Sequence, residues 1–233
     1  MESKKEIFML VDGPAIVHRA YHAMPPFTTS DGTPTGAIHG FFAMLLKLTQ
    51  QLKPAYVVVA FDRAKPNFRQ ELYVGYQAQR PKMESDLSSQ YEAIIEILRK
   101  AKIQEVGVDG FEADDVIGTL SERANKEGVI TYIVTGDRDM LQLVDQDTLV
   151  LMPVKGISEV RLFDEESVRT KYEVDPAQIV ELKALTGDPS DNYPGVAGVG
   201  PKTASNLIRE YKNVENIYKH LDDIAVRNKS LAQ

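Results

Sequence analysis

Short apolar runs that alternate with helical patterns constrain the fold of this chain more than any other feature. Four runs are brief and rich in Val and Ile, as buried strands are, and they occupy residues 7–11, 56–61, 103–108 and 130–134. Between them, residues 36–52 and 87–101 carry apolar side chains at helical spacing. Alternation of strands and helices predicts an α/β fold, with a mostly parallel central sheet and helices on both faces.

Composition narrows the class of protein further. The chain has 233 residues, of which 43% are hydrophobic and 26% charged, as expected for a globular protein with one core or a core plus an appendage. No apolar run approaches the ~20 residues that span a bilayer. Without cysteine, disulfides and thiolate metal sites are excluded, and we expect a cytoplasmic location and no membrane partner. The net charge of −7 argues against a nucleic-acid partner, but the placement of charges matters more than their sum.

The second half of the chain changes pattern. Residues 148–152 and 157–162, joined by 153–156, predict a β-hairpin. After it the pattern becomes helical. Asp175, Pro176 and Gln178 combine an N-cap, a first-turn proline and a capping-box partner, which predicts a helix that Gly187 ends.

Residues 63–86 differ from the rest of the chain, because they mix cations and aromatic side chains with few aliphatic ones. We interpret them as an exposed insertion. The cations are Arg63, Lys65, Arg69, Arg80 and Lys82, and the aromatic residues are Phe68, Tyr73 and Tyr76.

Acidic residues follow the predicted strands at the end where parallel sheets bind ligands. These acids are Asp12, Asp62, Glu112, Asp114, Asp115, Asp137 and Asp139, and two more, Asp188 and Asp191, follow a predicted helix end. Each acid taken alone has a structural explanation, because acids also suit turns and the first turns of helices. The joint pattern is harder to explain that way, since four successive strands deliver acids at one end.

Carboxylates gathered in one crevice would repel each other and be partly protonated unless cations were bound. A set of oxygen ligands without His or Cys favours Mg²⁺ or Mn²⁺. Two such ions, roughly 3.5–4 Å apart, can activate a water and stabilise the leaving oxygen of a phosphodiester. The acids therefore predict a metal-dependent phosphodiesterase.

A glycine-rich segment, residues 195–204, leads directly into a helix. Its glycines, Gly195, Gly198 and Gly200, let the backbone approach a ligand closely, and N–H groups at a helix start can hold a phosphate. Lys202 adds a positive charge. A tight turn between helices is the simpler alternative. The repeated glycine steps with a helix on each side instead favour a helix-hairpin-helix motif, which grips DNA backbones without reading sequence.

Taken together, these segments resemble the 5′ nuclease and flap endonuclease family, most closely the nuclease domain of bacterial DNA polymerase I. The resemblance runs in the family's order from about residue 7 to about residue 211. The matching segments are 11–13, 19–23, 61–62, 68–72, 112–115, 135–139, 187–192 and 195–204.

The resemblance implies roles that composition does not. It makes the nine acids metal-binding and catalytic, with Arg80 as a further catalytic residue. Residues 68–80 would form a helical arch through which a single-stranded 5′ end passes. The implied DNA contacts are Arg19, Arg69, Tyr76, Gln77, Arg80, Lys82, Gly195, Gly198, Gly200, Lys202 and Thr203. Two or more Mg²⁺ or Mn²⁺ ions would be the cofactors, with K⁺ as a candidate ion at the hairpin.

The implied function is structure-specific 5′–3′ exonuclease and flap endonuclease action on DNA with a 5′ flap, a nick or an RNA primer end.

Two departures from the family pattern stand out. The family usually places Lys after the arch tyrosine, whereas Tyr76 is followed by Gln77. The family's nuclease domain also usually continues with more helices beyond the position of Gln233, so we expect a fragment, with a polymerase domain as a candidate continuation.

We therefore expect a monomer with an α/β nuclease core at residues 1–170, including an arch at 63–86. A helical region with the helix-hairpin-helix would occupy residues 171–233. A phosphatase with an aspartyl nucleophile would explain Asp137 and Asp139 but not the other seven acids, and two further alternatives remain open. A non-catalytic module that binds DNA structures would keep hairpin and arch but would not need every acid. A ribonuclease of the PIN type would share the sheet but would not need the glycine-rich hairpin.

Overall fold

The computed structural model describes residues 5–63, 65–156 and 159–227. Its backbone divides into two compact units. The first unit runs to Phe68 and resumes from Lys82 to Asp164. The second combines the segment Arg69–Pro81 with the chain from Glu165 onward.

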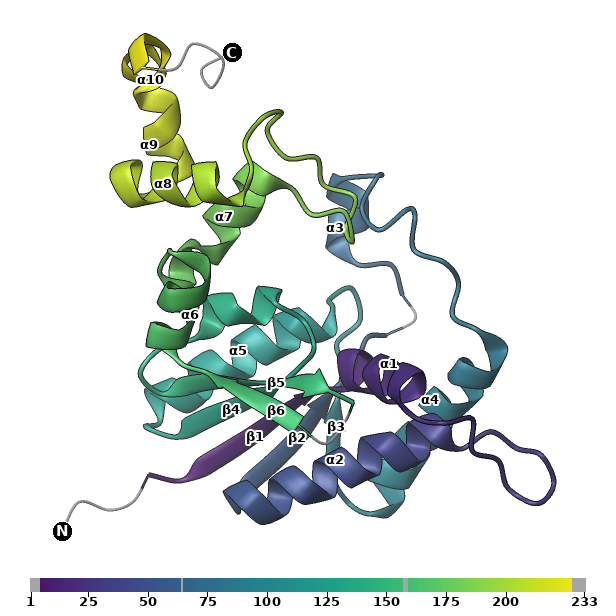
Figure 1. Cartoon of the computed structure of the whole chain (residues 1–233). Coiled ribbons are helices and arrows are strands. Elements are labelled where there is room, and N and C mark those ends of the chain that lie inside the picture. Colours follow the sequence, from purple (N-terminus) through teal and green to yellow (C-terminus); the bar gives the residue numbers. More distant parts are fainter. Residues whose placement is uncertain (1–4, 64, 157–158, 228–233) are drawn as a thin grey trace. The chain divides into compact units, whose positions relative to one another are not determined.

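A six-stranded sheet with strand order β3-β2-β1-β4-β5-β6 forms the centre of the first unit (Figure 1). Its strands are β1 Ile7–Asp12, β2 Tyr56–Ala60, β3 Gln104–Val106, β4 Ile130–Val134, β5 Thr148–Lys155 and β6 Glu159–Phe163. Strands β1 to β5 pair in parallel, and β6 pairs antiparallel to β5. The prediction of a mostly parallel sheet is confirmed.

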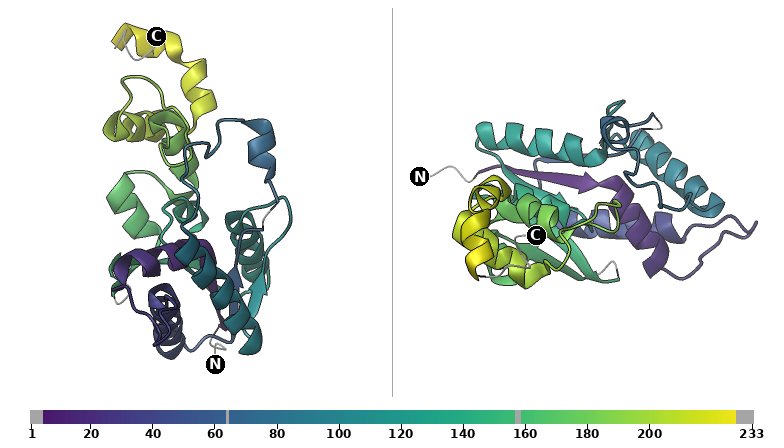
Figure 2. Two further views of the ribbon diagram at one scale, coloured as in Figure 1. Left: turned by 90° about the vertical axis from the view of Figure 1, so that its right-hand side faces the viewer. Right: turned by 90° about the horizontal axis from the view of Figure 1, so that it is seen from above.

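Helices cover both faces of this sheet, as predicted. Side chains alternate between the two faces along a strand. On one face Met9 and Val11 pack in a core cluster with α1 (Gly13–Ala23), α2 (Gly36–Leu52) and α4 (Ser85–Lys100). Helix α5 (Ala113–Lys126) packs against β1, β2 and β4 and lies on the other side of the sheet from α2 (Figure 2).

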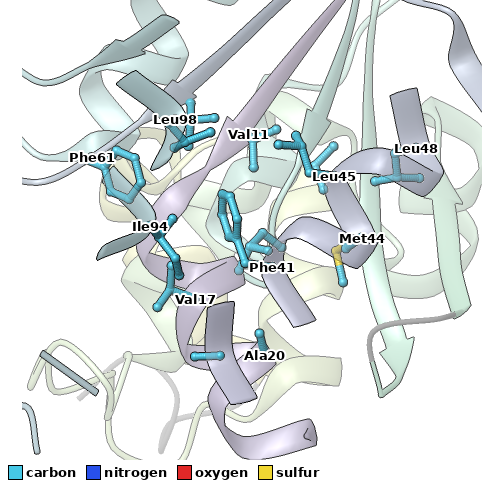
Figure 3. Packing of buried hydrophobic residues seen from close by; sticks show 14 of the residues in the cluster. Val11, Val17, Ala20, Phe41, Met44, Leu45, Leu48, Phe61, Ile94 and Leu98 are labelled. Carbon is cyan, nitrogen blue, oxygen red and sulfur yellow. The ribbon is translucent and has the colours of Figure 1, made fainter. Parts of the chain in front are cut away.

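The core cluster explains why these helices form where the sequence places them. Phe41, Leu45 and Leu48 of α2 belong to the same cluster as Ile94 and Leu98 of α4 (Figure 3). All these side chains are at most 5% exposed. Burying a side chain of this size stabilises a fold by roughly 1.5–3 kcal/mol before the entropy cost of ordering it. Within the described ranges, no helix combines the length and apolarity needed to cross a membrane.

Two strand predictions need correction. β3 covers only Gln104–Val106 of the predicted 103–108, because its partner β2 ends at Ala60, which pairs with Val106. The predicted turn at 153–156 lies largely within β5, which runs to Lys155 and pairs Pro153 with Val160. The proline is tolerated because the parallel partner β4 reaches only Leu151. Residues 157–158 of the predicted second strand lie outside the described residues.

The second unit is helical. Its elements are α6 Glu165–Tyr172, η2 Pro176–Gln178, α7 Ile179–Thr186, α8 Pro201–Tyr211, α9 Val214–Lys219 and α10 Leu221–Arg227. The capping box at Asp175 and Gln178 is present, although the first turn is 3₁₀ rather than α-helical. Helix α7 ends at Thr186 and is followed by Gly187, whose φ of 78° suits glycine, so the predicted end of this helix is confirmed.

The insertion contains one short helix, α3 (Phe68–Leu72), followed by hydrogen-bonded turns. Tyr76 N donates to Tyr73 O at 2.9 Å, and Arg80 N donates to Gln77 O at 2.9 Å. Leu72 and Val74 are 81% and 90% exposed. In contrast to these two exposed residues, Tyr76 has a buried side chain.

Candidate active site

Asp12 is the last residue of β1 and also caps the helix that follows. Its Oδ1 accepts a hydrogen bond from Ala15 N at 3.0 Å, which satisfies a backbone donor at the start of α1. Its Oδ2 accepts a hydrogen bond from Thr135 Oγ1 at 2.5 Å, at the end of the neighbouring strand β4. Both carboxylate oxygens of this buried acid are therefore held in place.

The start of α5 adds further acids. Glu112 is its N-cap and forms a capping box with Asp115, whose Oδ2 accepts from Glu112 N at 2.9 Å. Asp62, which follows β2, accepts from Ala113 N at 2.7 Å. Asn67 Nδ2 donates to Glu112 Oε1 at 2.8 Å. The first turn of one helix thus fixes carboxylates from two parts of the chain.

The turn after β4 is organised by its own side chains. Asp137 N donates to Thr135 Oγ1 at 2.9 Å, and Asp139 N donates to Asp137 Oδ1 at 2.8 Å. Asp139 then begins η1 (Asp139–Leu143). Thr135 therefore connects Asp12 and Asp137 through one hydroxyl.

Electrostatics show which of these acids lie together. Burial raises the pKa of Asp114 to about 8, and the negative charges of Asp12, Asp137, Glu112 and Asp62 raise it further. Burial likewise raises the pKa of Asp12 to about 6, against hydrogen bonds from Thr135 and Ala15. Burial and the charges of Asp62 and Asp12 raise the pKa of the Tyr91 hydroxyl.

We call Asp12, Asp62, Glu112, Asp114 and Asp137 the acid cluster. Raised pKa values such as those of Asp12 and Asp114 are expected where carboxyl groups are buried close together without a compensating cation. All the side-chain atoms of the cluster that could bind a metal are carboxylate oxygens, the ligands that Mg²⁺ and Mn²⁺ prefer. The residues of the cluster therefore fit a divalent cation of this class.

Asp188 and Asp191 lie in a loop of the second unit that follows α7. Asp188 Oδ2 pairs with Lys183 Nζ at 2.5 Å, and its Oδ1 accepts from Ser190 N and Oγ at 2.9 and 2.6 Å. Burial raises the pKa of Asp188, but the bonds from Lys183 and Ser190 outweigh it and lower the pKa to about 2. This carboxylate is thus ionised at neutral pH.

Asp191 contacts the insertion. Arg80 Nη2 and Gln77 Nε2 each lie 3.0 Å from Asp191 Oδ1, and Gln77 N donates to Asp191 O at 3.2 Å. Gln77 also donates to Tyr76 Oη at 2.9 Å and has a φ of 52°. Gln77, the residue that departs from the family pattern, is therefore a hydrogen-bond partner of Asp191, a predicted metal-binding acid.

The predicted hairpin joins α7 to α8. Gly195 packs against the end of α7, where a Cβ would lie 2.3 Å from the carbonyl carbon of Thr186, so no other residue fits. Gly198 has a φ of 80°, and Gly200 is the N-cap of α8 with Pro201 in the first turn. Lys202 is exposed and Thr203 half-buried at the same helix start.

The remaining predicted DNA contacts belong to several different elements. Arg19, on α1, donates from Nε to Gly156 O at 3.0 Å. Arg69 is half-buried on α3, whereas Lys82 is exposed. Tyr76 is only 6% exposed, and its ring lies 5.8 Å from that of Tyr193.

Sequence reasoning did not single out three residues that position these acids: Thr135, Asn67 and Lys183. Thr135 could have been suspected, because it is the polar residue directly after a buried strand. Lys183 lies one helical turn before Gly187, at the spacing that brings a side chain back to a helix end. Nothing in the local sequence marks Asn67.

A parallel sheet with carboxylates at the carboxyl ends of its strands defines the class of α/β enzymes that bind ligands at that edge. A family model described as the 5′-3′ exonuclease N-terminal resolvase-like domain matches residues 7–173, and one described as the 5′-3′ exonuclease C-terminal SAM fold matches residues 174–233. The chain belongs to the 5′-3′ exonuclease family, as the resemblance in its motifs predicts.

Relatives include both free-standing and larger proteins. The chain is 42% identical over 211 residues to a 5′-3′ exonuclease of Aquifex aeolicus (strain VF5), a match that covers 91% of this chain and 72% of that one. It is 42% identical over 222 residues to DNA polymerase I of Mycobacterium leprae (strain TN), covering 94% of this chain and 24% of that one. The chain thus spans about a quarter of the polymerase relative's length.

Among solved structures, the bacteriophage T5 D15 flap endonuclease in complex with DNA and metal ions has a similar fold. The TM-score is 0.76 at 22% sequence identity, and the match covers 93% of this chain and 79% of that one. At this identity the likeness supports the fold of the chain, and the family membership rests on the sequence matches.

Proposed function

We propose that this chain hydrolyses phosphodiester bonds at the 5′ ends of branched or nicked DNA, as a metal-dependent 5′–3′ exonuclease and flap endonuclease. The observation that carries the proposal is the acid cluster. Burial, together with the negative charges of the other members, raises the pKa of Asp114 to about 8, so the site is poised to exchange protons for a cation. Family membership supplies the nuclease class.

The acid cluster would hold divalent ions, Mg²⁺ or Mn²⁺, two or more in number. When bound, such ions supply a Lewis acid and lower the pKa of a water. The contribution of the chain is to hold the carboxylate oxygens in position before a metal ion binds. Thr135 and Ala15 hold the two oxygens of Asp12, and Asn67 holds Glu112. Asp115, Asp139, Asp188 and Asp191 are proposed as further metal-binding acids on the resemblance alone.

Binding of DNA is assigned to separate groups. Lys202 and the N–H groups at the start of α8 would hold a duplex phosphate without reading sequence, with K⁺ as a candidate ion there. Arg80 would contact a phosphate of the single strand. Both contacts place a positive charge at a phosphate, although the chain as a whole has a net charge of −7. Arg19, Arg69, Tyr76, Gln77, Lys82 and Thr203 are proposed as further contacts.

We propose the same activity whether or not a polymerase is attached, because relatives of both kinds match this chain. The substrates would be 5′ flaps, nicks and RNA primer ends, met in the cytoplasm by a monomeric nuclease. Residues 1–170 with the arch at 63–86 would be the nuclease core, and residues 171–233 the helical region that binds DNA.

Cleavage of a 5′-labelled flap duplex tests the proposal. Activity should require Mg²⁺ or Mn²⁺ and vanish in EDTA. A matched single-stranded RNA separates the PIN-type alternative, which predicts cleavage of the RNA and not of the flap. Binding of the flap without cleavage in either metal would favour a non-catalytic module. Full cleavage in chelator would exclude the metal-dependent mechanism.

A further inference from the structure

A pocket of about 320 Å³ lies in the second unit, beside the loop that carries Asp188 and Asp191. It is formed by the insertion and by the loop before the hairpin. Its lining residues are Tyr73, Gln79, Pro189, Asn192, Tyr193 and Pro194. The pocket is in the size range of small-molecule sites, and none of its lining side chains carries a charge.

Two stacked tyrosines make the apolar wall of this pocket. The rings of Tyr73 and Tyr193 lie 5.2 Å apart with an interplanar angle of 17°. They remain 36% and 41% exposed. The ring of the buried Tyr76 lies 5.8 Å from that of Tyr193. The wall is therefore an aromatic surface that solvent reaches.

Carboxamides make the polar part of the pocket. Asn192 is held by four hydrogen bonds. Its Nδ2 donates to Gly75 O at 2.9 Å, its Oδ1 accepts from Gln79 Nε2 at 3.1 Å, its backbone O accepts from Tyr73 Oη at 3.1 Å, and its backbone N donates to Pro189 O at 3.3 Å. A carboxamide nitrogen has two N–H groups, so one bond from each nitrogen leaves a second donor. The amides are thus oriented and still able to donate.

We propose that this pocket binds one unpaired nucleobase of the DNA single strand, stacked on the tyrosine wall with its edge toward Gln79 and Asn192. The proposal rests on the proposed function. A base offers a π-face for stacking and polar atoms at its edge, which match the two parts of the pocket. A phosphate would need a cation in the pocket wall, and none of the lining residues carries a charge.

The position of the pocket indicates which base it takes. Asn192 and Tyr193 directly follow Asp191, and Gln79 directly precedes Arg80. A strand whose phosphate contacts Arg80 would therefore present a base to Gln79 and Tyr193. Stacking on aromatic side chains is tolerant of sequence, so the pocket would serve flaps of any composition.

Abasic substitution tests the proposal. Flap duplexes with one abasic site, moved nucleotide by nucleotide along the flap, are titrated against the protein by fluorescence anisotropy in Ca²⁺. We expect one flap position at which loss of the base weakens binding about fivefold to tenfold. Tyr193→Leu should weaken binding to the intact flap by a similar factor. With this variant, an abasic site at that position should weaken binding no further, as in a double-mutant cycle. Tyr193→Phe, which keeps the ring, should behave as wild type.

Tyr218→Leu is the matched control, because this tyrosine is 67% exposed on α9 and does not line the pocket. It should retain the position-dependent loss. Gln79→Ala keeps the tyrosine wall and should reduce the loss at the same position, which tests the polar part if Tyr193→Leu fails to fold. Abasic sites in the template strand should show no coupling to Tyr193.

Uniform loss at every flap position, or coupling to a template base, would overturn the proposal. The two hypotheses fail separately. A protein that cleaves flaps in Mg²⁺ but shows no position-dependent loss lacks the base pocket and keeps the proposed function. A protein that shows the coupling but cleaves nothing keeps the pocket and lacks the function.

Discussion

Thr135 Oγ1 donates a hydrogen bond of 2.5 Å to Asp12 Oδ2, across a sequence separation of 123 residues. The same hydroxyl accepts from Asp137 N. One side chain thus positions two carboxylates from neighbouring strands. Groups that orient metal-binding carboxylates are worth about 10–100-fold in metal affinity or activity.

Thr135→Val should therefore lower flap cleavage about 10–100-fold and raise the Mg²⁺ concentration needed for half-maximal rate. Thr131→Val is the control on the same strand. Among the described residues nothing hydrogen-bonds the buried Thr131 hydroxyl, so this change should leave activity unchanged and raise the free energy of unfolding by about 1 kcal/mol. Steady-state kinetics and urea melts measure both. Equal activity of the two variants would show that Thr135 does not position Asp12.

The pKa of Asp114 predicts how stability depends on pH. Its folded-state value, about 8, is above its ordinary value of 3.8, so the folded protein binds more protons between these values. The free energy of unfolding should fall as pH rises through this window in EDTA. Asp12, with a pKa of about 6, acts in the same direction. Asp188, with a pKa of about 2, acts oppositely but only in acid.

Melting temperatures in EDTA should accordingly fall from about pH 5 to about pH 8. Asp114→Asn should flatten this dependence, and Mg²⁺ should reduce it, because a cation replaces the proton. A dependence as steep in Asp114→Asn as in the wild type would place the proton uptake elsewhere.

Asp137→Asn should abolish cleavage while leaving flap affinity within a few-fold. Asp137 belongs to the acid cluster, whereas affinity depends mainly on phosphate contacts elsewhere. Asp223→Asn, an exposed acid on α10, is the charge-matched control and should cleave normally. Binding and single-turnover assays separate the two effects. If Asp137→Asn lost binding and rate equally, its role would be structural.

Gln77→Lys should raise flap cleavage efficiency about fivefold at low salt, since charge-assisted hydrogen bonds are roughly twice as strong as neutral ones. The gain should shrink as salt rises, because exposed charges are screened. Gln77→Met keeps the length without the charge and should give no gain. Kinetics at two salt concentrations decide it. No gain at low salt would mean that a lysine here is taken up by Asp191, which Gln77 contacts at 3.0 Å.

Lys202→Ala should weaken duplex binding equally for all sequences and reduce the slope of log affinity against log salt by about one unit. Lys219→Ala, a cation at the end of α9, is the control in the same unit. An unchanged slope for Lys202→Ala would reduce the hairpin to a turn between helices.

Local patterns predicted most of the fold. Residues 36–52 have the periodicity of a helix packed on one face, and α2 has these bounds. The gathering of acids at one end of the sheet could also be predicted, because parallel strands all end at the same edge. The length of β3 and the place of Pro153 were not, since both depend on where a neighbouring strand ends.

The site shows the same division. Asp12 and Asp137 could be predicted from their positions after strands, but their common link, Thr135, requires β1 and β4 to be neighbours. Asn67 reaches Glu112 over 45 residues, and no spacing rule signals that contact. The partner of Gln77 could not be predicted either, because it joins the insertion to a loop 114 residues away.

The loop that carries Asp188 and Asp191 is closed by its own backbone. Asp188 and Tyr193 exchange two hydrogen bonds of 2.9 Å, and Val196 N donates to Leu185 O at 2.8 Å. Gly187 and Gly195 meet so closely that a Cβ on Gly187 would lie 2.4 Å from Gly195 N. The length of this loop is therefore fixed, and a residue added or deleted between the two glycines would break its closing hydrogen bonds. Because these bonds lie within the loop and the end of α7, the segment sets the spacing of Asp188 and Asp191 by itself.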